Sequence, residues 1–260
     1  MKSFSFVLIL VFIIGCKEEK TFADDIVLSF PKETEMKFQK FNEGLEEYSS
    51  SIIYIGKVKD TIPVKYYPSI YLAPTPLPGF KLKTKKETED SITLSEIRKK
   101  YFFPKFDRIQ FSDKPIKFDS LTNDLLEIVV KPEDTIPQFV IDSTKKIKAY
   151  KAFPVFVKNV SGRKLKMIVD RYPGTAIFNK NKKWQIIKND YFYVCGDGMF
   201  MHKYWILNPD EIIIYSVNYF EGKQKMKFKV GLTPTFFSKE FEGNINPEII
   251  KRQRNIYEIK

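Results

Sequence analysis

The apolar residues of the chain fall into short runs, and after residue 145 these runs become regular. They recur about every 8–12 residues. The runs cover 147–157, 165–169, 175–178, 184–187, 191–194, 199–207, 211–217, 226–230 and 235–241. Turn-forming residues separate them, among them Val160-Ser161-Gly162, Asn179-Lys180-Asn181, Asp197-Gly198, Asn208-Pro209 and Glu221-Gly222. This rhythm is typical of an immunoglobulin-like antiparallel β-sandwich, which we predict over residues 146–260.

The first half of the chain is less regular but also favours strands. Runs rich in β-branched and aromatic residues cover 52–59, 61–67, 109–118, 125–130 and 139–141. Helical spacing of apolar residues predicts a helix within 31–48, and a short helix is expected within 91–103. We therefore predict a mainly β protein with few short helices. Its parts are an N-terminal β-rich region over 31–145 and a sandwich that ends in a helix after Asn246-Pro247.

The first twenty residues have the organisation of an export signal. Met1-Lys2 gives a basic start, residues 6–14 are all apolar, and Gly15-Cys16 follows. An apolar run of this length is typical of a secretory signal, because it is too short to cross about 30 Å of hydrocarbon as a helix. We predict that residues 1–15 are removed as a signal peptide. The charged residues 16–30 then form a tether.

Ile13-Ile14-Gly15-Cys16 resembles the lipobox of bacterial lipoproteins. The resemblance implies that the Cys16 sulfur receives a diacylglyceryl group, that the chain is cut before Cys16, and that the new amine is acylated with a fatty acid such as palmitate. Lys17, Glu18 and Glu19 resemble the signal that places Bacteroidetes lipoproteins on the outer face of the outer membrane. The implied location is the cell surface, with the membrane bound through the lipid. An ordinary solvated tether on a periplasm-facing protein is the alternative.

Other parts of the chain are similar to uncharacterised envelope lipoproteins of Bacteroidetes. The similar segments are 54–57, 60–62, 153–159, 181–187, 195–196 and 238–247. The resemblance supports an envelope location and a β fold, and it implies no activity because none of these segments is a catalytic motif.

Composition and charge narrow the possible functions. The chain is 43% hydrophobic and 15% aromatic, so it can bury a core and is not intrinsically disordered. With Cys16 acylated, Cys195 has no partner for an intramolecular disulfide. The net charge of +12 comes mostly from lysines scattered along the chain. A nucleic-acid reader favours arginine forks, so we expect no nucleic-acid partner and interpret the lysines as solvated faces near anionic lipopolysaccharide.

The sequence carries no recognisable catalytic or metal-binding constellation. A single histidine, His202, and one mature cysteine exclude the usual zinc sites. The predicted Asp197-Gly198 hairpin places Cys195 one rung away from His202, too far for a ready nucleophile pair, so Cys195 is expected in the core. The acids at 119–127 lack the spacing of a calcium loop. No Gly-x-Ser-x-Gly elbow or Gly-rich phosphate loop is present. We assign no catalytic residue, metal or cofactor.

Three functions stay open at this point. We favour a non-catalytic binding or structural module for a glycan or protein partner. A hydrolase of surface glycan or peptide is an alternative, because the sequence does not give the separation of a carboxylate pair. A periplasmic immunity lipoprotein against an antibacterial toxin is another. Trp184 and Trp205 fit either a flat sugar-stacking face or a core, and we expect Trp184 in the core.

Overall fold

The computed structural model describes residues 20–32, 34–41, 51–68, 85–105, 107–142, 144, 146–168, 173–188, 202–233, 235–253 and 257–259. Cys16, Lys17, Glu18 and Glu19 lie outside these residues, as does Cys195 with the Asp197-Gly198 turn. The predictions made for them stay predictions.

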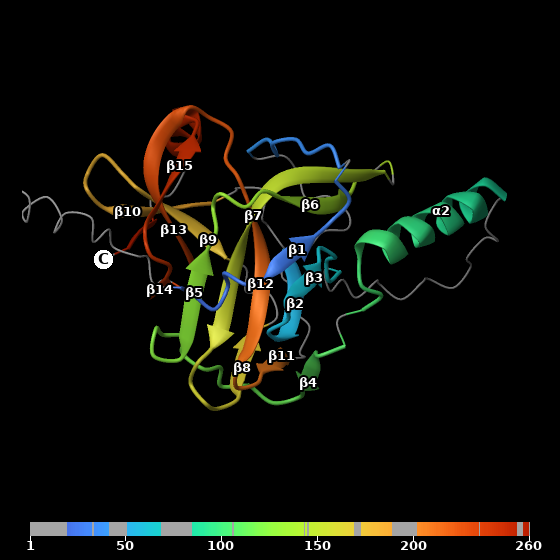
Figure 1. Ribbon diagram of the computed structural model, residues 1–260, viewed down its shortest axis with the longest axis horizontal. Coiled ribbons are helices and arrows are strands. Elements are labelled where there is room, and N and C mark those ends of the chain that lie inside the picture. The colour runs from blue at the N-terminus through green and yellow to red at the C-terminus, as the bar shows by residue number, and fades with distance from the viewer. Residues whose placement is uncertain are drawn as a thin grey trace, which may run out of the picture.

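The predicted mainly β architecture is confirmed, and its centre is a five-stranded antiparallel sheet (Figure 1). Strand β2 (Ile52–Lys57) pairs with β12 (Glu211–Asn218), and β12 pairs in turn with β7 (Ile147–Asn159). Strand β7 is 13 residues long and pairs with two strands along one edge. Its last residues pair with β5 (Leu126–Val130), and its first residues pair with β6 (Ile136–Ile141).

Two further sheets cover one face of the central sheet. A six-stranded sheet comprises β14 (Phe236–Phe237), β13 (Gln224–Thr233), β9 (Gly174–Phe178), β10 (Trp184–Ile187) and β16 (Tyr257–Ile259) in order, with β15 (Phe241–Ile245) paired to β13. A three-stranded sheet comprises β4 (Gln110–Ser112), β11 (His202–Leu207) and β8 (Leu165–Ile168). Val155 and Tyr215 of the central sheet share one buried cluster with Trp205 and Val230.

The opposite face of the central sheet is covered by N-terminal elements. These are the parallel pair β1 (Val27–Ser29) and β3 (Thr61–Pro63), and the C-terminal end of helix α2 (Lys85–Tyr101). Phe156 and Ile214 pack there in a second cluster that also contains Tyr66 and Phe102. Burial on both faces explains why residues 152–157 of β7 and 212–215 of β12 are apolar without alternation.

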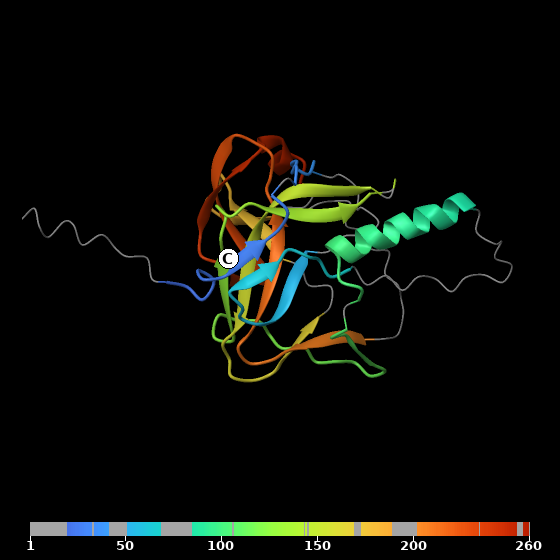
Figure 2. The ribbon, with the colours of Figure 1, turned by 45° about the vertical axis from the view of Figure 1, so that its right-hand side comes forward.

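Helix α2 contacts the body only in part. Leu94, Ile97 and Tyr101 pack against the second cluster, while the remainder of the helix extends away from the sheets (Figure 2). The helix begins at Lys85, earlier than the predicted 91–103.

The helix predicted within 31–48 is wrong for the residues the structure describes. Residues 34–40 are extended, and Lys37 forms a parallel bridge with Tyr150 of β7. The Lys37 N–H donates to the Ala149 carbonyl at 3.1 Å, and the Lys37 carbonyl accepts from the Lys151 N–H at 2.8 Å. These hydrogen bonds to the edge of β7 stabilise the extended conformation more than the spacing of the apolar residues favours a helix. Residues 42–48 lie outside the described part.

The C-terminal helix is present but shorter than expected. Helix α3 (Pro247–Lys251) begins after Asn246, whose side chain accepts a hydrogen bond from the Glu248 N–H at 3.0 Å. The chain then returns to the sheet as β16, so Ile259, an apolar residue that would continue the helical pattern, lies in a strand, and Ile256 lies outside the described residues.

The central sheet takes strands from both sides of the predicted boundary at 145/146, because β2 pairs with β12. That boundary stays a prediction. The immunoglobulin-like arrangement of the strands also stays a prediction.

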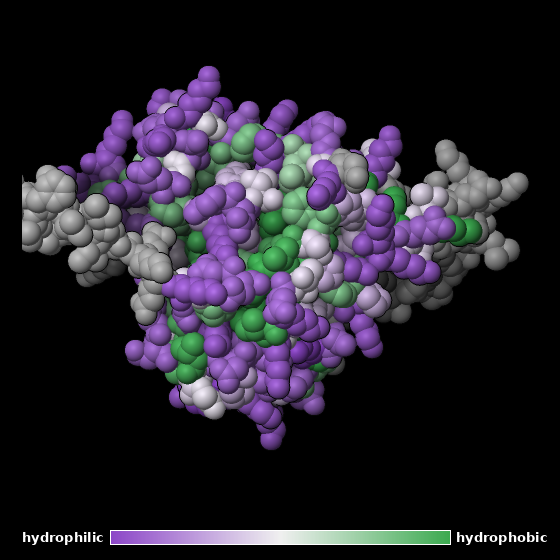
Figure 3. Space-filling model, in the orientation of Figure 1, coloured by the Kyte–Doolittle hydropathy of each residue, from purple (hydrophilic) through white to green (hydrophobic). Residues whose placement is uncertain are grey.

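The face shown in Figure 3 is largely hydrophilic, interrupted by several smaller hydrophobic areas.

The two tryptophans occupy different environments. Trp205 on β11 is fully buried at 1% exposure in the first core cluster. Trp184 on β10 is half-buried and does not belong to a core cluster, so its predicted core position is wrong. It lies on the outer face of β10, whereas its neighbours Gln185 and Ile187 on the inner face are buried.

Candidate functional site

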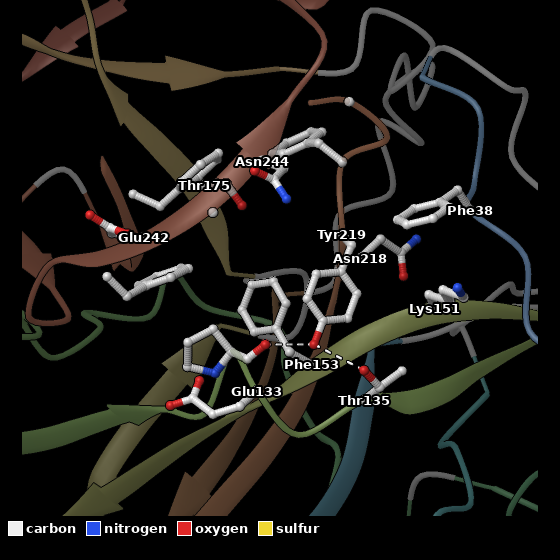
Figure 4. Close-up of a pocket in the computed structure, with 16 residues that line it drawn as sticks. Phe38, Glu133, Thr135, Lys151, Phe153, Thr175, Asn218, Tyr219, Glu242 and Asn244 are labelled. Atoms are coloured by element: carbon white, nitrogen blue, oxygen red, sulfur yellow. Dashed lines mark hydrogen bonds between the residues drawn. The ribbon is translucent and has the colours of Figure 1, made fainter. Parts of the chain in front are cut away.

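A cleft of about 390 Å³ lies where the central and six-stranded sheets approach each other (Figure 4). We call it the aromatic cleft, because six of the side chains that line it are aromatic. They are Phe38, Phe153, Tyr219, Phe220, Phe228 and Phe241. A volume of this size is at the lower end of the range for small-molecule sites, about 300–1,000 Å³.

Five of these rings form a continuous series. Phe153 contacts Tyr219 with ring centroids 5.1 Å apart and Phe241 at 5.7 Å. Phe228 stacks on Phe241 at 5.9 Å and on Phe220 at 6.1 Å. All four distances fall in the favourable range for aromatic pairs. Phe153 and Phe228 are buried and form the floor, while the other three rings are half-buried and partly open to the cleft.

The strand pairing explains why the rings meet. Phe228 on β13 lies directly opposite Phe241 on β15. Gly243 allows the two strands to close over the Phe228 ring, since a Cβ at this position would lie 2.8 Å from Phe228 Cδ2. Tyr219 and Phe220 follow the end of β12, where the pairing with β7 stops and the chain turns toward β13.

The Tyr219 hydroxyl fixes one wall of the cleft. It donates to the Pro132 carbonyl at 2.6 Å and lies 3.3 Å from the Thr135 hydroxyl, both in the β5–β6 connection (Figure 4). Burial raises the pKa of Tyr219 above its usual value, so the hydroxyl stays protonated and remains a donor at physiological pH.

Polar side chains surround the rings. Lys151 and Asn218 lie beside Phe38 at one end of the cleft, and Glu242 lies at the other (Figure 4). The Asn218 side chain donates to the Gln39 side chain, and its buried Oδ1 has no hydrogen-bond partner among the described residues. A buried acceptor without a partner is uncommon in proteins.

Thr175 and Asn244 complete the polar rim on the side of the six-stranded sheet (Figure 4). Among the described residues that line the cleft there is no serine, cysteine or histidine. The arrangement can stack a ligand on rings and hydrogen-bond its edges.

The other candidates from the sequence are not brought to this site. Trp205 is buried in the core, and Trp184 lies on an outer sheet face. The two therefore do not form a common sugar-stacking surface. Asp119 accepts hydrogen bonds from the Arg163 side chain and the Lys166 N–H, both at 2.7 Å. Within the described part of the chain, no group of three or more His, Cys, Asp or Glu side chains is placed to hold a metal ion.

Sequence reasoning missed the cleft because its residues run from position 38 to position 244. No local motif marks a site assembled from an N-terminal segment, strands of two sheets and two loops.

In the parts of the chain that the structure covers, no helix has the length and apolar character needed to cross a bilayer. No protein-family model, curated protein or solved structure matches the chain.

Proposed function

We propose that the protein is a lipid-anchored cell-envelope protein that acts as a non-catalytic binding module, with the aromatic cleft as its ligand site. The observation that carries this proposal is the series of five touching rings surrounded by polar side chains. The lipid on Cys16 and surface export through Lys17, Glu18 and Glu19 rest on the sequence resemblance alone. An immunoglobulin-like sandwich is part of the same proposal.

The ligand class that suits the cleft is a neutral saccharide. A sugar ring presents C–H groups on its faces, which stack on aromatic rings, and hydroxyl groups at its edge. The exposed Asn244 amide at the rim of the cleft both donates and accepts hydrogen bonds. Glu242 and Thr175 add polar groups on the same rim.

The test is a binding titration of the chain from Lys17 onward. Isothermal titration calorimetry with cello-, malto-, xylo- and chito-oligosaccharides should identify at least one that binds. Asn244→Trp places a bulky side chain at the rim and should weaken that binding by at least about tenfold. Lys239→Trp adds the same side chain at an exposed position that does not line the cleft, and should leave binding unchanged. Equal effects of the two variants would contradict the assignment.

A hydrolase is the second candidate, because Glu133 and Glu242 both line the cleft from different elements. Two carboxylates across a sugar site are the usual machinery of glycoside hydrolysis. Both side chains are exposed, and Glu242 lies 3.9 Å from the Lys225 ammonium. Chromatography of the bound oligosaccharide after long incubation distinguishes the two functions. Cleavage that is lost in both Glu133→Gln and Glu242→Gln would replace the binding module by the enzyme.

A further inference from the structure

The hairpin formed by β9 and β10 carries a concentrated positive charge. Residues 171–189 contain no aspartate or glutamate. Three lysines, Lys180, Lys182 and Lys183, stand in the turn between the two strands, and all three are exposed. Figure 1 shows this turn in gold at the left-hand edge of the body.

The turn is held in one conformation. Asn179 Oδ1 accepts hydrogen bonds from the N–H groups of Asn181 at 3.0 Å and Lys183 at 3.1 Å. The Asn179 N–H donates to the Lys183 carbonyl at 2.8 Å, and Lys182 adopts a left-handed φ of 58°. The lysines are therefore presented together by a fixed turn.

An aromatic pair lies directly behind the lysines. Trp184 is opposite Phe178 in the hairpin register, and their ring centroids are 5.3 Å apart. The Lys229 Nζ lies 4.4 Å from the centroid of the Trp184 ring, within the range of a cation–π contact. Both aromatic rings are half-buried on the outer sheet face. The end of the hairpin thus combines exposed positive charge with amphipathic aromatic surface.

We propose that this end of the hairpin binds the surface of an anionic lipid bilayer. The lysines would attract lipid phosphates, each with a favourable contribution near the surface that salt screens. Tryptophan is the residue that favours the boundary between headgroups and hydrocarbon, which is where a ring behind the lysines would lie. The inference does not depend on the ligand of the aromatic cleft, and its test uses a chain without the lipid anchor.

The experiment is flotation of the chain from Lys17 onward with vesicles of phosphatidylcholine, with or without phosphatidylglycerol. All described contacts fall within residues 20–259, so this chain keeps them. We expect binding to the anionic vesicles only. The triple variant Lys180→Gln, Lys182→Gln, Lys183→Gln should lower the partition coefficient at least about tenfold, and added salt should do the same to the wild type.

The matched control removes the same charge elsewhere. Lys114, Lys117 and Lys164 are exposed and lie outside the hairpin, and the triple change to glutamine should lower the partition coefficient less than about twofold. Equal losses in the two triple variants would show a net-charge effect and overturn the proposal. Circular dichroism of both variants establishes that they are folded. Failure of the wild type to float with anionic vesicles also overturns it.

Fluorescence distinguishes a bilayer from any other polyanion. Brominated lipid chains should quench Trp184 on binding, whereas the buried Trp205 emission should stay constant. Trp184→Phe should abolish the quenching. If soluble polyphosphate binds as tightly as the vesicles and brominated lipids do not quench, the hairpin recognises phosphate polymers and the membrane proposal is overturned.

Discussion

At the scale of single residues, the Asn159 side chain forms hydrogen bonds with the backbone of four other residues. It is fully buried at the end of β7. Its Nδ2 donates to the carbonyls of Arg163, Leu207 and Asn208 at 2.8, 3.1 and 3.0 Å. Its Oδ1 accepts from the Ser161 N–H at 3.0 Å. One amide therefore joins the β7–β8 turn to the end of β11.

Asn159→Asp should destabilise the fold by about 3 kcal/mol or more at neutral pH. The substitution keeps the shape of the side chain but replaces the donor with a carboxylate that faces carbonyl oxygens in a buried site. Urea unfolding of the chain measures the loss. Asn123 is exposed, and Asn123→Asp should change the free energy of unfolding by less than about 0.5 kcal/mol. Similar values for the two variants would show that the amide network contributes little.

At the scale of elements, the two tryptophan-bearing strands differ in what they bury. Trp205→Ala on β11 should cost about 3–5 kcal/mol, as for a large aromatic side chain removed from a core. Trp184→Ala on β10 should cost about 1–2 kcal/mol, because the ring is half-buried and the substitution removes its contacts with Phe178 and Lys229. Thermal and urea unfolding give both values. A larger loss for Trp184 would mean that the β9–β10 hairpin contributes more to the core than its burial indicates.

The elements also show which sequence patterns are sufficient to predict secondary structure in this protein. Strand β12 and the second half of β7 were predictable because residues 212–215 and 152–157 are continuous apolar runs, and turn residues follow both strands. The conformation of the segment around Lys37 was not predictable, because it is determined by backbone hydrogen bonds to the edge of β7. Helix α2 starts earlier than predicted because the part before Leu94 has little apolar periodicity. The aromatic cleft was not predictable at all, because Phe153 and Phe241 meet only through tertiary pairing.

At the scale of the whole molecule, stability should fall in acid because several carboxyl groups are held in their charged form. Burial raises the pKa of Glu211, but hydrogen bonds from the Arg108 guanidinium at 2.8 and 3.0 Å and from the Asn208 N–H outweigh this, so its pKa lies below the usual 4.5. The pKa of Asp142 is lowered by hydrogen bonds from Thr144 and the Lys146 N–H.

A carboxyl group with a lowered folded pKa stabilises the fold above its unfolded pKa, and this contribution disappears as the pH falls through the folded value. The free energy of unfolding should therefore be constant above about pH 5 and decrease below about pH 4.5. Glu211→Gln should be less stable at pH 7 and show a shallower decrease. Urea titrations at pH 7, 5, 4 and 3 would detect this, and parallel curves for the two proteins would exclude Glu211 as a source of the acid sensitivity.

We propose that the residues beside Cys16 decide which side of the membrane the whole molecule faces. In this proposal, Lys17, Glu18 and Glu19 follow the lipidated Cys16 in the chain, and their charges would keep this segment in water, close enough to the bilayer for transport machinery to recognise it together with the lipid. Protease added to intact cells should therefore degrade the wild-type protein. Glu18→Ala with Glu19→Ala should protect the chain by leaving it in the periplasm, and Cys16→Ala should abolish lipidation and membrane attachment. If the wild type resists protease in intact cells and is digested after lysis, the protein faces the periplasm, and its cleft meets periplasmic ligands rather than glycans outside the cell.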